Sequence, residues 1–188
     1  MSEKAFIFIK IYVLKIILSK EQLALTIKRL ANQILENHPG LQNTVIIGMQ
    51  PRGIMLSDRI VRELQQLIDP ATIQYGKLDI TFYRDDVRKS LHIASNTDIP
   101  FSIENKEVVL VDDVLYTGRT IRAALDALLD YGRPSKVALC VLVDRRFSRE
   151  LPIQPDYLGK AIDTIFSQRV TVLWNENEQN EQVMLLDN

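Results

Sequence analysis

The stretch "VVLVDDVLYTGRT", residues 108–120, joins three unlike pieces of sequence. An aliphatic run is followed by two adjacent carboxylates, Asp112 and Asp113, and then by a loop of Tyr116, hydroxyl groups and glycine. The aliphatic run is typical of a strand that is buried on both faces of a parallel sheet. Carboxylates repel phosphate, whereas the loop after them is suited to hold one. The stretch therefore predicts a ligand with two parts: an anionic group held by the loop, and a group that is not anionic facing the acids.

The loop at residues 116–120 leads directly into a helical pattern, where backbone N–H groups are unpaired and the helix dipole is positive. Thr117 and Thr120 add hydroxyl donors, and Gly118 allows a tight turn around an oxyanion. The chain contains no GxxxxGK[ST] pattern, so the predicted phosphate site is not a P-loop. The structural alternative is an ordinary helix start with Thr117 or Thr120 as the N-cap.

The two acids come before this loop, so they should face a part of the ligand that is not phosphate. Sugar hydroxyls donate hydrogen bonds to carboxylates, and a divalent cation carried by a phosphorylated ligand would bind them as well. A phosphorylated ribose with a vicinal diol and a bound metal satisfies both halves of the motif. The alternative for Asp112 and Asp113 is a strand end that is simply solvated.

The totals describe one ordinary domain, since 188 residues with 46% hydrophobic side chains can bury a single core. The net charge is -1, so any anion or RNA site must be a local patch. Cys140 is the one cysteine, which fits a cytoplasmic protein with no disulfide in the chain. Lys10 and Lys15 interrupt the apolar residues 5–18, which are too short for a membrane span. We assign residues 1–18 to an extension, as an extra strand or a misplaced start codon, and residues 19–188 to the domain.

Apolar periodicity predicts alternating strands and helices. Ser19 and Gln22 form a capping-box pattern before a helix over Lys20–Asn37. Further helices are expected at residues 54–68 and 120–130, the latter with Leu125 and Leu129 facing inward. Strands are expected at residues 44–48, 78–83, 107–111 and 137–143, and in "VTVLW" and "VMLL" near the C-terminus. The alternation predicts an α/β fold with a mostly parallel twisted sheet flanked by helices.

Chemically loaded residues follow three of these strands. Arg52 and Gly53 follow the first, Asp112 and Asp113 the second, and Asp144 and Arg145 the third. Because ligands bind beyond the carboxyl ends of parallel strands, these groups should form one cleft. Arg84, with Asp85 and Asp86, begins a polar stretch to residue 100, which predicts a mobile loop closing over the ligand. The alternative for that stretch is a solvated charge cluster.

The 108–120 stretch resembles the motif by which type I phosphoribosyltransferases bind 5-phosphoribosyl-1-pyrophosphate (PRPP). Together with "LDITFYRDD", "DALLDYGRP", "VLVDR" and "RELPIQPDYLGK", it resembles the PyrR family of pyrimidine operon regulators, which also carry uracil phosphoribosyltransferase activity. The resemblance covers roughly residues 20–172. It implies a type I phosphoribosyltransferase fold with a hood loop, and the reaction of uracil with PRPP to give UMP and pyrophosphate.

The resemblance also implies roles for individual residues. Asp112 and Asp113 would hold the ribose hydroxyls and, mainly through PRPP, Mg²⁺. Arg52 and Gly53 would hold pyrophosphate, Arg84 would belong to the hood, and Asp144 and Arg145 would lie beside uracil. The nucleotide site as a whole would comprise Arg52, Gly53, Arg84, Asp112, Asp113, Val114, Leu115, Tyr116, Thr117, Gly118, Arg119 and Thr120. The residues implied in catalysis are Arg52, Arg84, Asp112, Asp113 and Tyr116. The RNA face would carry Lys28, Arg29, Arg149 and Lys160.

The chain departs from the family pattern in several places. Tyr116 stands where purine enzymes of the class carry aspartate, and Pro51 removes one backbone N–H from the pyrophosphate loop. "DRRFSRELP" is one residue longer than the family's "DRGHRELP". Asn32 and Gln154 replace the His and Arg that characterised regulators carry on their RNA face. These changes affect the RNA face more than the PRPP cleft.

Several readings remain open from the sequence. The partners implied are PRPP, uracil, UMP, a leader mRNA and further copies of the chain in a homodimer or larger assembly. One alternative is a nucleotide sensor with little catalytic activity, and another is a phosphoribosyltransferase for a different base. A third is a phospho-acceptor receiver domain, which also has paired acids at a strand end. The "TGRT" segment directly after the acids is foreign to receiver domains.

Overall fold

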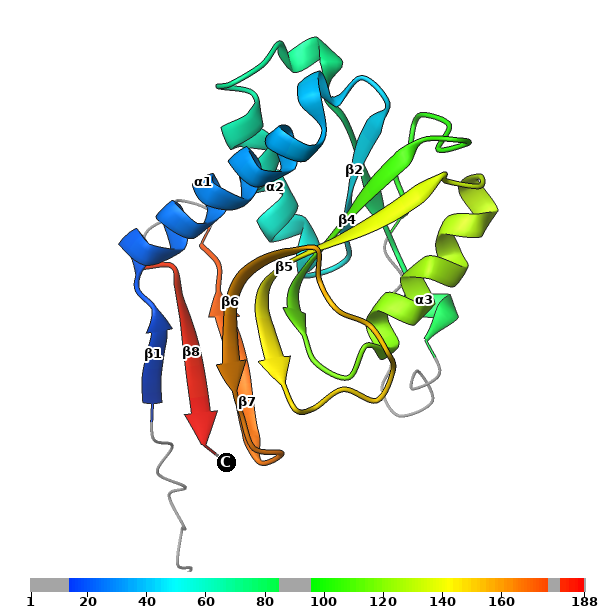
Figure 1. The fold of residues 1–188 in the computed structure, drawn as a ribbon. Coiled ribbons are helices and arrows are strands. Elements are labelled where there is room, and N and C mark those ends of the chain that lie inside the picture. Colours follow the sequence, from blue (N-terminus) through cyan, green and yellow to red (C-terminus); the bar gives the residue numbers. More distant parts are fainter. Residues whose placement is uncertain (1–13, 85–95, 176–179, 188) are drawn as a thin grey trace, which may run out of the picture.

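Five parallel strands form the central sheet in the order β3 (Gln74–Leu78), β2 (Thr44–Met49), β4 (Glu107–Leu115), β5 (Lys136–Arg146) and β6 (Tyr157–Asp163) (Figure 1). The structure, a computed structural model, describes residues 14–84, 96–175 and 180–187. β2, β4 and most of β5 are buried, as their β-branched and aliphatic sequences predict. The predicted mostly parallel sheet is confirmed.

Helices cover both faces of this sheet (Figure 1). α1 (Lys20–Asn37) and α2 (Gly53–Leu64) pack on one face, and α3 (Arg119–Leu128) packs on the other. α1 begins with the predicted capping box, in which Ser19 and Gln22 each bond the other's backbone N–H. Among the described residues, no helix is both long and apolar enough to cross a membrane.

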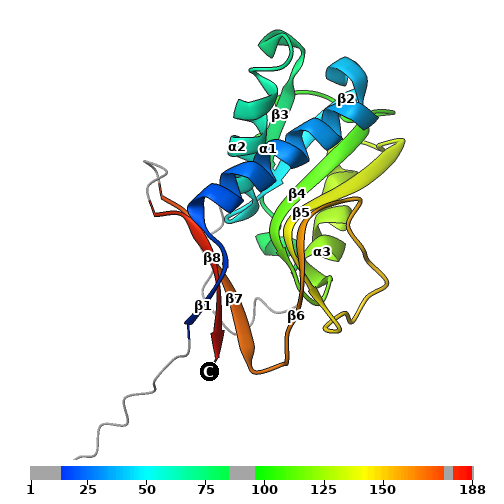
Figure 2. The ribbon, with the colours of Figure 1, turned by 60° about the vertical axis from the view of Figure 1, so that its left-hand side comes forward.

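A second, antiparallel sheet lies beside β6 (Figure 2). Its order is β1 (Leu14–Leu18), β8 (Gln182–Asp187) and β7 (Gln168–Leu173). Val170, Val172 and Val183 of this sheet share a core with Leu142 and Ile162 of the parallel sheet. The apolar N-terminal segment therefore does contribute an extra strand at residues 14–18, while residues 1–13 lie outside the described part of the chain.

Two details of the predicted elements are wrong. β3 ends at Leu78, and Thr81–Tyr83 is a 3₁₀ turn that leaves the Phe82 side chain 85% exposed instead of aligned with Leu78. Leu125 and Leu129 were expected inside but are 38% and 65% exposed. The buried face of α3 is centred on small alanines, which puts Leu125 at its rim. The switch to 3₁₀ geometry at Leu129–Tyr131 then turns Leu129 away from that face.

Candidate functional site

The paired acids lie inside β4, because this strand continues four residues beyond its predicted end, to Leu115. Asp112 is 8% exposed and Asp113 is 5% exposed. The Asp113 backbone N–H donates to Asp112 Oδ1 over 2.8 Å. The solvated strand end considered from the sequence is therefore wrong, since both carboxylates are buried at the carboxyl edge of the sheet.

Burial makes these acids hard to ionise. Desolvation, reinforced by the charge of Asp113, raises the pKa of Asp112 to about 8, against a smaller lowering by Arg52 and Arg84. Burial also raises the pKa of Asp113, while Arg52 opposes the rise. At neutral pH the ligand-free pair therefore tends to hold a proton. A ligand that brings a cation or several hydrogen-bond donors would stabilise the ionised form.

The loop after β2 delivers a cation to this pair. Arg52 Nε donates to Asp113 Oδ2 over 2.9 Å, and the other end of its guanidinium lies 3.4 Å from the Val172 carbonyl in β7. Gly53 permits this approach, because a Cβ there would lie 2.4 Å from the Val111 carbonyl oxygen. The Gln50–Pro51 peptide bond is cis. The structure thus brings Arg52 and Gly53 beside the acids, as the carboxyl-end rule predicts.

The hydroxyl- and glycine-containing loop forms the start of α3. Gly118 is the N-cap with a φ of 93°, and the backbone N–H of Arg119, the first residue of the helix, donates to the Thr117 hydroxyl over 3.4 Å. The alternative in which Thr117 or Thr120 serves as N-cap is therefore wrong. The Thr117 carbonyl accepts from the backbone N–H groups of Glu150 and Leu151 over 3.0 and 3.2 Å. The loop before α3 is thus held from outside by the β5–β6 connection, and it ends at the amino end of a helix, where backbone N–H groups suit an anion.

The end of β5 supplies a second set of charged side chains. The Arg145 guanidinium lies 3.9 Å from the centre of the Tyr116 ring. Its Nε donates to Thr164 over 3.0 Å and a terminal nitrogen donates to the Gln168 carbonyl over 2.8 Å. Burial lowers the pKa of Arg145. Arg145 is therefore fixed as a flat partner for Tyr116 at the side of the cleft.

Arg149 belongs to the same cleft. Its guanidinium donates to the Asp144 carboxylate and to the Tyr116 carbonyl, which joins the β5 end to the phosphate loop. The sequence placed Arg149 on an RNA face with Lys28, Arg29 and Lys160, and the structure does not bring it together with them. The side chains of Lys28 and Arg29 lie on α1 and that of Lys160 lies on β6.

A cavity of about 310 Å³ opens beside Tyr116 and Thr117. Its remaining lining residues are Phe147, Ser148, Glu150, Thr164, Ile165 and Phe166. The rings of Phe147 and Phe166 are 86% and 91% exposed, so two aromatic side chains stand at its mouth. Sequence reasoning missed this wall. The available signal was a phenylalanine shortly after the end of each of two neighbouring strands, β5 and β6.

The remaining predicted residues are placed as follows. Arg84 lowers the pKa of Asp112 through its charge, so it lies in the field of the acids, whereas Asp85, Asp86 and the rest of the predicted closing loop to residue 95 lie outside the described residues. Leu115 is buried in the core on the α3 face of the sheet, Val114 packs against the core on the other face, and the Arg119 side chain pairs with Glu150. The charges of Arg52 and Arg84 thus both act on Asp112.

The acids fit a metal that arrives with a ligand. Within the described ranges, no group of three or more His, Cys, Asp or Glu side chains could hold a metal ion by itself. Two carboxylates nevertheless lie buried next to each other, and burial raises the pKa of each, so a cation would stabilise their ionised form. Such a pair fits Mg²⁺ that would be held mainly by the phosphates of a ligand.

Comparison with known proteins places the chain in a family. The model of the phosphoribosyl transferase domain family matches residues 14–176. The bifunctional protein PyrR of Enterococcus faecalis is 48% identical over 161 residues, covering 84% of this chain and 88% of that protein. The bifunctional protein PyrR of Bacillus subtilis is 43% identical over 178 residues, covering 92% and 97%.

Solved structures share the fold at low sequence identity. The hypoxanthine phosphoribosyltransferase of Trypanosoma cruzi superposes with a TM-score of 0.66 at 20% identity, over 93% of this chain and 97% of that one. A hypoxanthine phosphoribosyltransferase of Staphylococcus aureus gives a TM-score of 0.62 at 22% identity, over 81% and 79%. The family model, the sequence relatives and the fold agree, and the chain belongs to the phosphoribosyl transferase domain family and, within it, to the bifunctional PyrR proteins.

Proposed function

We propose that this protein transfers the phosphoribosyl group of PRPP to uracil, giving UMP and pyrophosphate. The observation that carries the proposal is the group of side chains at the carboxyl edge of the sheet. There, Asp112 and Asp113 are buried in β4, Arg52 donates to Asp113, and the chain continues from the acids to the helix end at Gly118. A phosphorylated ribose with a pyrophosphate on its first carbon has groups that suit each of the three.

The ribose and its phosphate occupy the centre in this proposal. Asp112 and Asp113 accept hydrogen bonds from the two ring hydroxyls, which replaces the water that burial removes from the carboxylates. The backbone N–H groups at the start of α3, with Thr117 and Thr120, hold the 5-phosphate. The segment that carries Glu150 and Leu151 braces this loop through the Thr117 carbonyl.

The leaving group lies on the side of Arg52. Its guanidinium contacts Asp113 and lies close to the Val172 carbonyl, so it is pre-positioned before a ligand arrives. Arg52 and Gly53 hold the departing pyrophosphate, and Arg84, whose charge already acts on Asp112, adds a second cation for it. When bound with PRPP, Mg²⁺ neutralises phosphate charge next to Asp112 and Asp113.

The base enters the cavity beside Tyr116. The reaction passes through an oxocarbenium-like state at the anomeric carbon, so the protein must align N1 of uracil with that carbon and exclude water. Arg145 and Tyr116 form one flat wall of this cavity, and the exposed side chains of Phe147 and Phe166 lie at its mouth. Tyr116 is a poor base when neutral. We therefore propose that positioning, more than proton abstraction, activates uracil.

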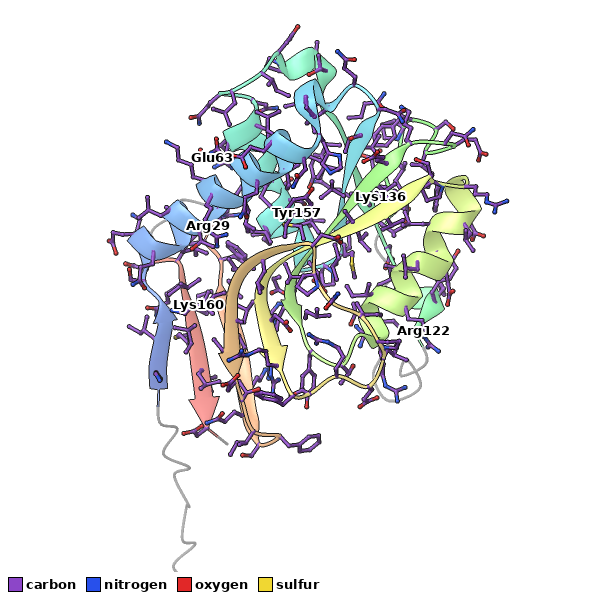
Figure 3. The ribbon with its side chains drawn as sticks, in the orientation of Figure 1. Arg29, Glu63, Arg122, Lys136, Tyr157 and Lys160 are labelled. Atoms are coloured by element: carbon purple, nitrogen blue, oxygen red, sulfur yellow. The ribbon has the colours of Figure 1, made fainter. Side chains whose placement is uncertain are left out.

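The second activity of the PyrR proteins is proposed for this chain as well. With UMP in the cleft, the protein binds a leader mRNA of pyrimidine biosynthesis genes in the cytoplasm, as a homodimer or larger assembly. Arg29 supports this proposal, because it donates to the Gly159 carbonyl over 2.7 Å, directly before Lys160 on β6. Lys28 is its neighbour on α1. Figure 3 shows Arg29 and Lys160 on the same side of the molecule.

The enzymatic proposal is tested by mixing the protein with PRPP, Mg²⁺ and one labelled base at a time. We expect UMP to form from uracil, with much slower turnover of hypoxanthine, guanine and cytosine. Turnover of another base in preference to uracil would contradict the assignment. Absence of turnover with every base, together with tight UMP binding by calorimetry, would favour the alternative of a nucleotide sensor.

A further inference from the structure

Phe147, the residue directly after β5, has a backbone conformation that its residue type disfavours. Its φ is 64°, in the left-handed region that glycine adopts freely and that a bulky side chain adopts only under strain. Its side chain is also almost fully exposed, so burial of the ring contributes little to the stability of the ligand-free protein. Folding therefore does not account for an exposed apolar ring on a strained backbone, and a function does.

The rest of the described chain offers a comparison, because it contains three other non-glycine residues with a positive φ. Asn105 and Asn180 are of a residue type that enters this region readily. The Leu41 side chain is buried in the core, so its packing offsets the backbone strain. Neither explanation applies to Phe147, which lies in "DRRFSRELP", where the chain is one residue longer than the family pattern. The strained ring is thus a feature of this chain that points to a ligand.

The position of Phe147 shows which ligand is in reach. Phe147 lines the cavity beside Tyr116, together with Phe166 and the hydroxyl-bearing Thr117 and Thr164. The cavity volume of about 310 Å³ lies at the small end of the range of roughly 300–1,000 Å³ for small-molecule sites. Because the cavity borders the loop before α3, a ring attached to a phosphorylated ribose can enter it while the loop holds the phosphate.

Aromatic surface for a flat ligand is available at Phe147 but is partly occupied at Tyr116. The Arg145 guanidinium lies 3.9 Å from the centre of the Tyr116 ring and so covers one face of it. The exposed rings at the cavity are those of Phe147 and Phe166. A base that stacks on an exposed ring removes the apolar faces of both from water and gains a favourable contact between the two π-systems.

The ring of Phe147 is held in place before a ligand arrives. The Arg146 guanidinium lies 5.7 Å from the centre of the ring, which is within the range of a cation–π contact. Arg146 Nε in turn donates over 2.7 Å to Asp163 Oδ1, at the end of the neighbouring strand β6. Because the ring is already positioned, it loses less freedom when a base stacks on it.

We propose that Phe147 is a base-binding residue that stacks on the pyrimidine ring of uracil and UMP, and that its left-handed backbone holds the ring over the cavity. The inference rests on the proposed function, since it assigns a contact in the cavity that the base would occupy. The polar edge of the pyrimidine faces the hydroxyl groups of Thr117 and Thr164, and its flat face lies against the ring. A rival explanation is that another copy of the chain covers Phe147 in an assembly.

The test compares binding of UMP and of ribose 5-phosphate by calorimetry, because these ligands share the phosphorylated ribose and differ in the base. Phe147→Gly removes the ring and suits the left-handed backbone, whereas Phe147→Tyr keeps an aromatic ring. The control is Leu129→Ala, which removes an exposed apolar side chain just beyond the carboxyl end of α3. Each protein is also assayed for formation of UMP, for thermal unfolding without ligand, and for oligomeric state by light scattering.

We expect Phe147→Gly to weaken UMP binding by about tenfold, in line with the loss of one base–aromatic stack, and to leave ribose 5-phosphate binding unchanged. Its melting temperature should be no lower than that of the wild type, because relief of the strain offsets the extra freedom that glycine gives the unfolded chain. Phe147→Tyr and Leu129→Ala should bind both ligands like the wild type.

Equal UMP affinities of Phe147→Gly and the wild type would overturn the inference. A parallel loss of UMP and ribose 5-phosphate binding would also overturn it, since the substitution would then act on the loop before α3. A changed oligomeric state with unchanged UMP affinity would assign the ring to a contact between copies. If the wild type formed no UMP but its UMP binding still depended on Phe147, the proposed transferase activity would be wrong and this inference would stand.

Discussion

At the scale of single residues, the chemistry of the cleft depends on Asp112, a carboxyl group held where ionisation is costly. Its pKa is raised to about 8 by burial and by Asp113, which is the opposite of the change that an ordinary ion pair causes. Such a group is poorly suited to an empty cleft and well suited to one filled by hydroxyl donors and a cation. The buried acid that the ligand needs therefore lowers the stability of the ligand-free protein.

This predicts a pH-dependent stability with a definite sign. Folding raises the pKa of Asp112, so the protonated carboxyl group contributes its full stabilisation at a pH below the pKa that it has in the unfolded chain. This contribution is lost as the pH rises through the folded pKa of about 8. Asp112→Asn should therefore make the ligand-free protein more stable at alkaline pH by roughly 1–3 kcal/mol and flatten the dependence. Urea unfolding of both proteins across the pH range measures this. If Asp112→Asn were less stable than the wild type at alkaline pH, the ionised Asp112 would be stabilised by its surroundings, and the account of a costly buried charge would be wrong.

The ring of Tyr116 should matter more for uracil binding than its hydroxyl, although a hydrogen bond between Tyr116 and Arg145 opposes the lowering of the Arg145 pKa by burial. The stack with Arg145 at 3.9 Å depends on the aromatic face, so Tyr116→Phe should keep the KM for uracil near that of the wild type. Tyr116→Ala should raise that KM by about tenfold, since cation–π contacts are worth on the order of 1–2 kcal/mol in a desolvated site. Steady-state kinetics with each substrate varied in turn provides the measurement. A large loss of kcat in Tyr116→Phe would instead indicate proton transfer by the hydroxyl.

At the scale of elements, the loop before α3 needs glycine for two reasons. Gly118 has a φ of 93°, and a Cβ there would lie 3.3 Å from both Leu151 Cβ and Ile153 Cδ1. Gly118→Ala should therefore cost about 1–2 kcal/mol of stability from backbone strain. It should also weaken PRPP binding, because the added Cβ would displace the segment with Leu151 and Ile153 that packs against the loop.

Gly40→Ala provides the matched control for this loop. Gly40 has a φ of 65°, and its Cβ would approach nothing closer than 3.7 Å. It should show a similar loss of stability in thermal unfolding, while its KM for PRPP stays unchanged. An equal effect of the two substitutions on PRPP binding would mean that strain alone, and not the shape of the phosphate loop, explains Gly118.

A buried ion pair joins α2 to the second sheet. Arg59 pairs with Glu181, with side chains 9% and 7% exposed, and also donates to the carbonyls of Met55 and Asn175. Because α2 begins at the Arg52 loop, this contact fixes the second sheet relative to the cleft. Glu181→Gln leaves the arginine buried without its counter-charge and should cost about 3–5 kcal/mol.

The control for this pair is an exposed one. Asp163→Asn removes the partner of Arg146, where both side chains are about half exposed, and should cost at most about 1 kcal/mol. Chemical denaturation of the two variants compares the costs. If both variants lost a similar, small amount of unfolding free energy, the hydrogen bonds of Arg59 to the Met55 and Asn175 carbonyls would be sufficient to stabilise its buried charge.

The success of sequence reasoning also differs between elements. α1, β2 and the start of β4 were predicted because caps, β-branched runs and periodicity are local signals. β6, with the sequence "YLGKAID", carries no clear alternation, and the pairing of β1 with β8 joins opposite ends of the chain. Such pairing follows from packing across the whole molecule, which a local pattern does not contain.

At the scale of the whole molecule, the cleft lies where the two sheets meet. Arg52 binds Asp113 of the parallel sheet and approaches Val172 of the antiparallel sheet, so one side chain spans the junction. The grouping of Arg52, Asp112 and Arg145 at one edge was predicted from the order of strands alone. The aromatic wall and the inward turn of Arg149 were not, because they depend on how the β5–β6 connection folds back over Tyr116.

The most direct measurement is formation of UMP from labelled uracil and PRPP with Mg²⁺ by the wild type and by Asp112→Asn/Asp113→Asn. The two substitutions keep the shape of the buried pair and remove its charge. We expect turnover by the wild type, a loss of at least about a hundredfold in kcat/KM for the variant, and a fold that melts no earlier than the wild type. Equal turnover by the variant and the wild type would contradict the central claim that this buried acid pair holds the ribose of PRPP.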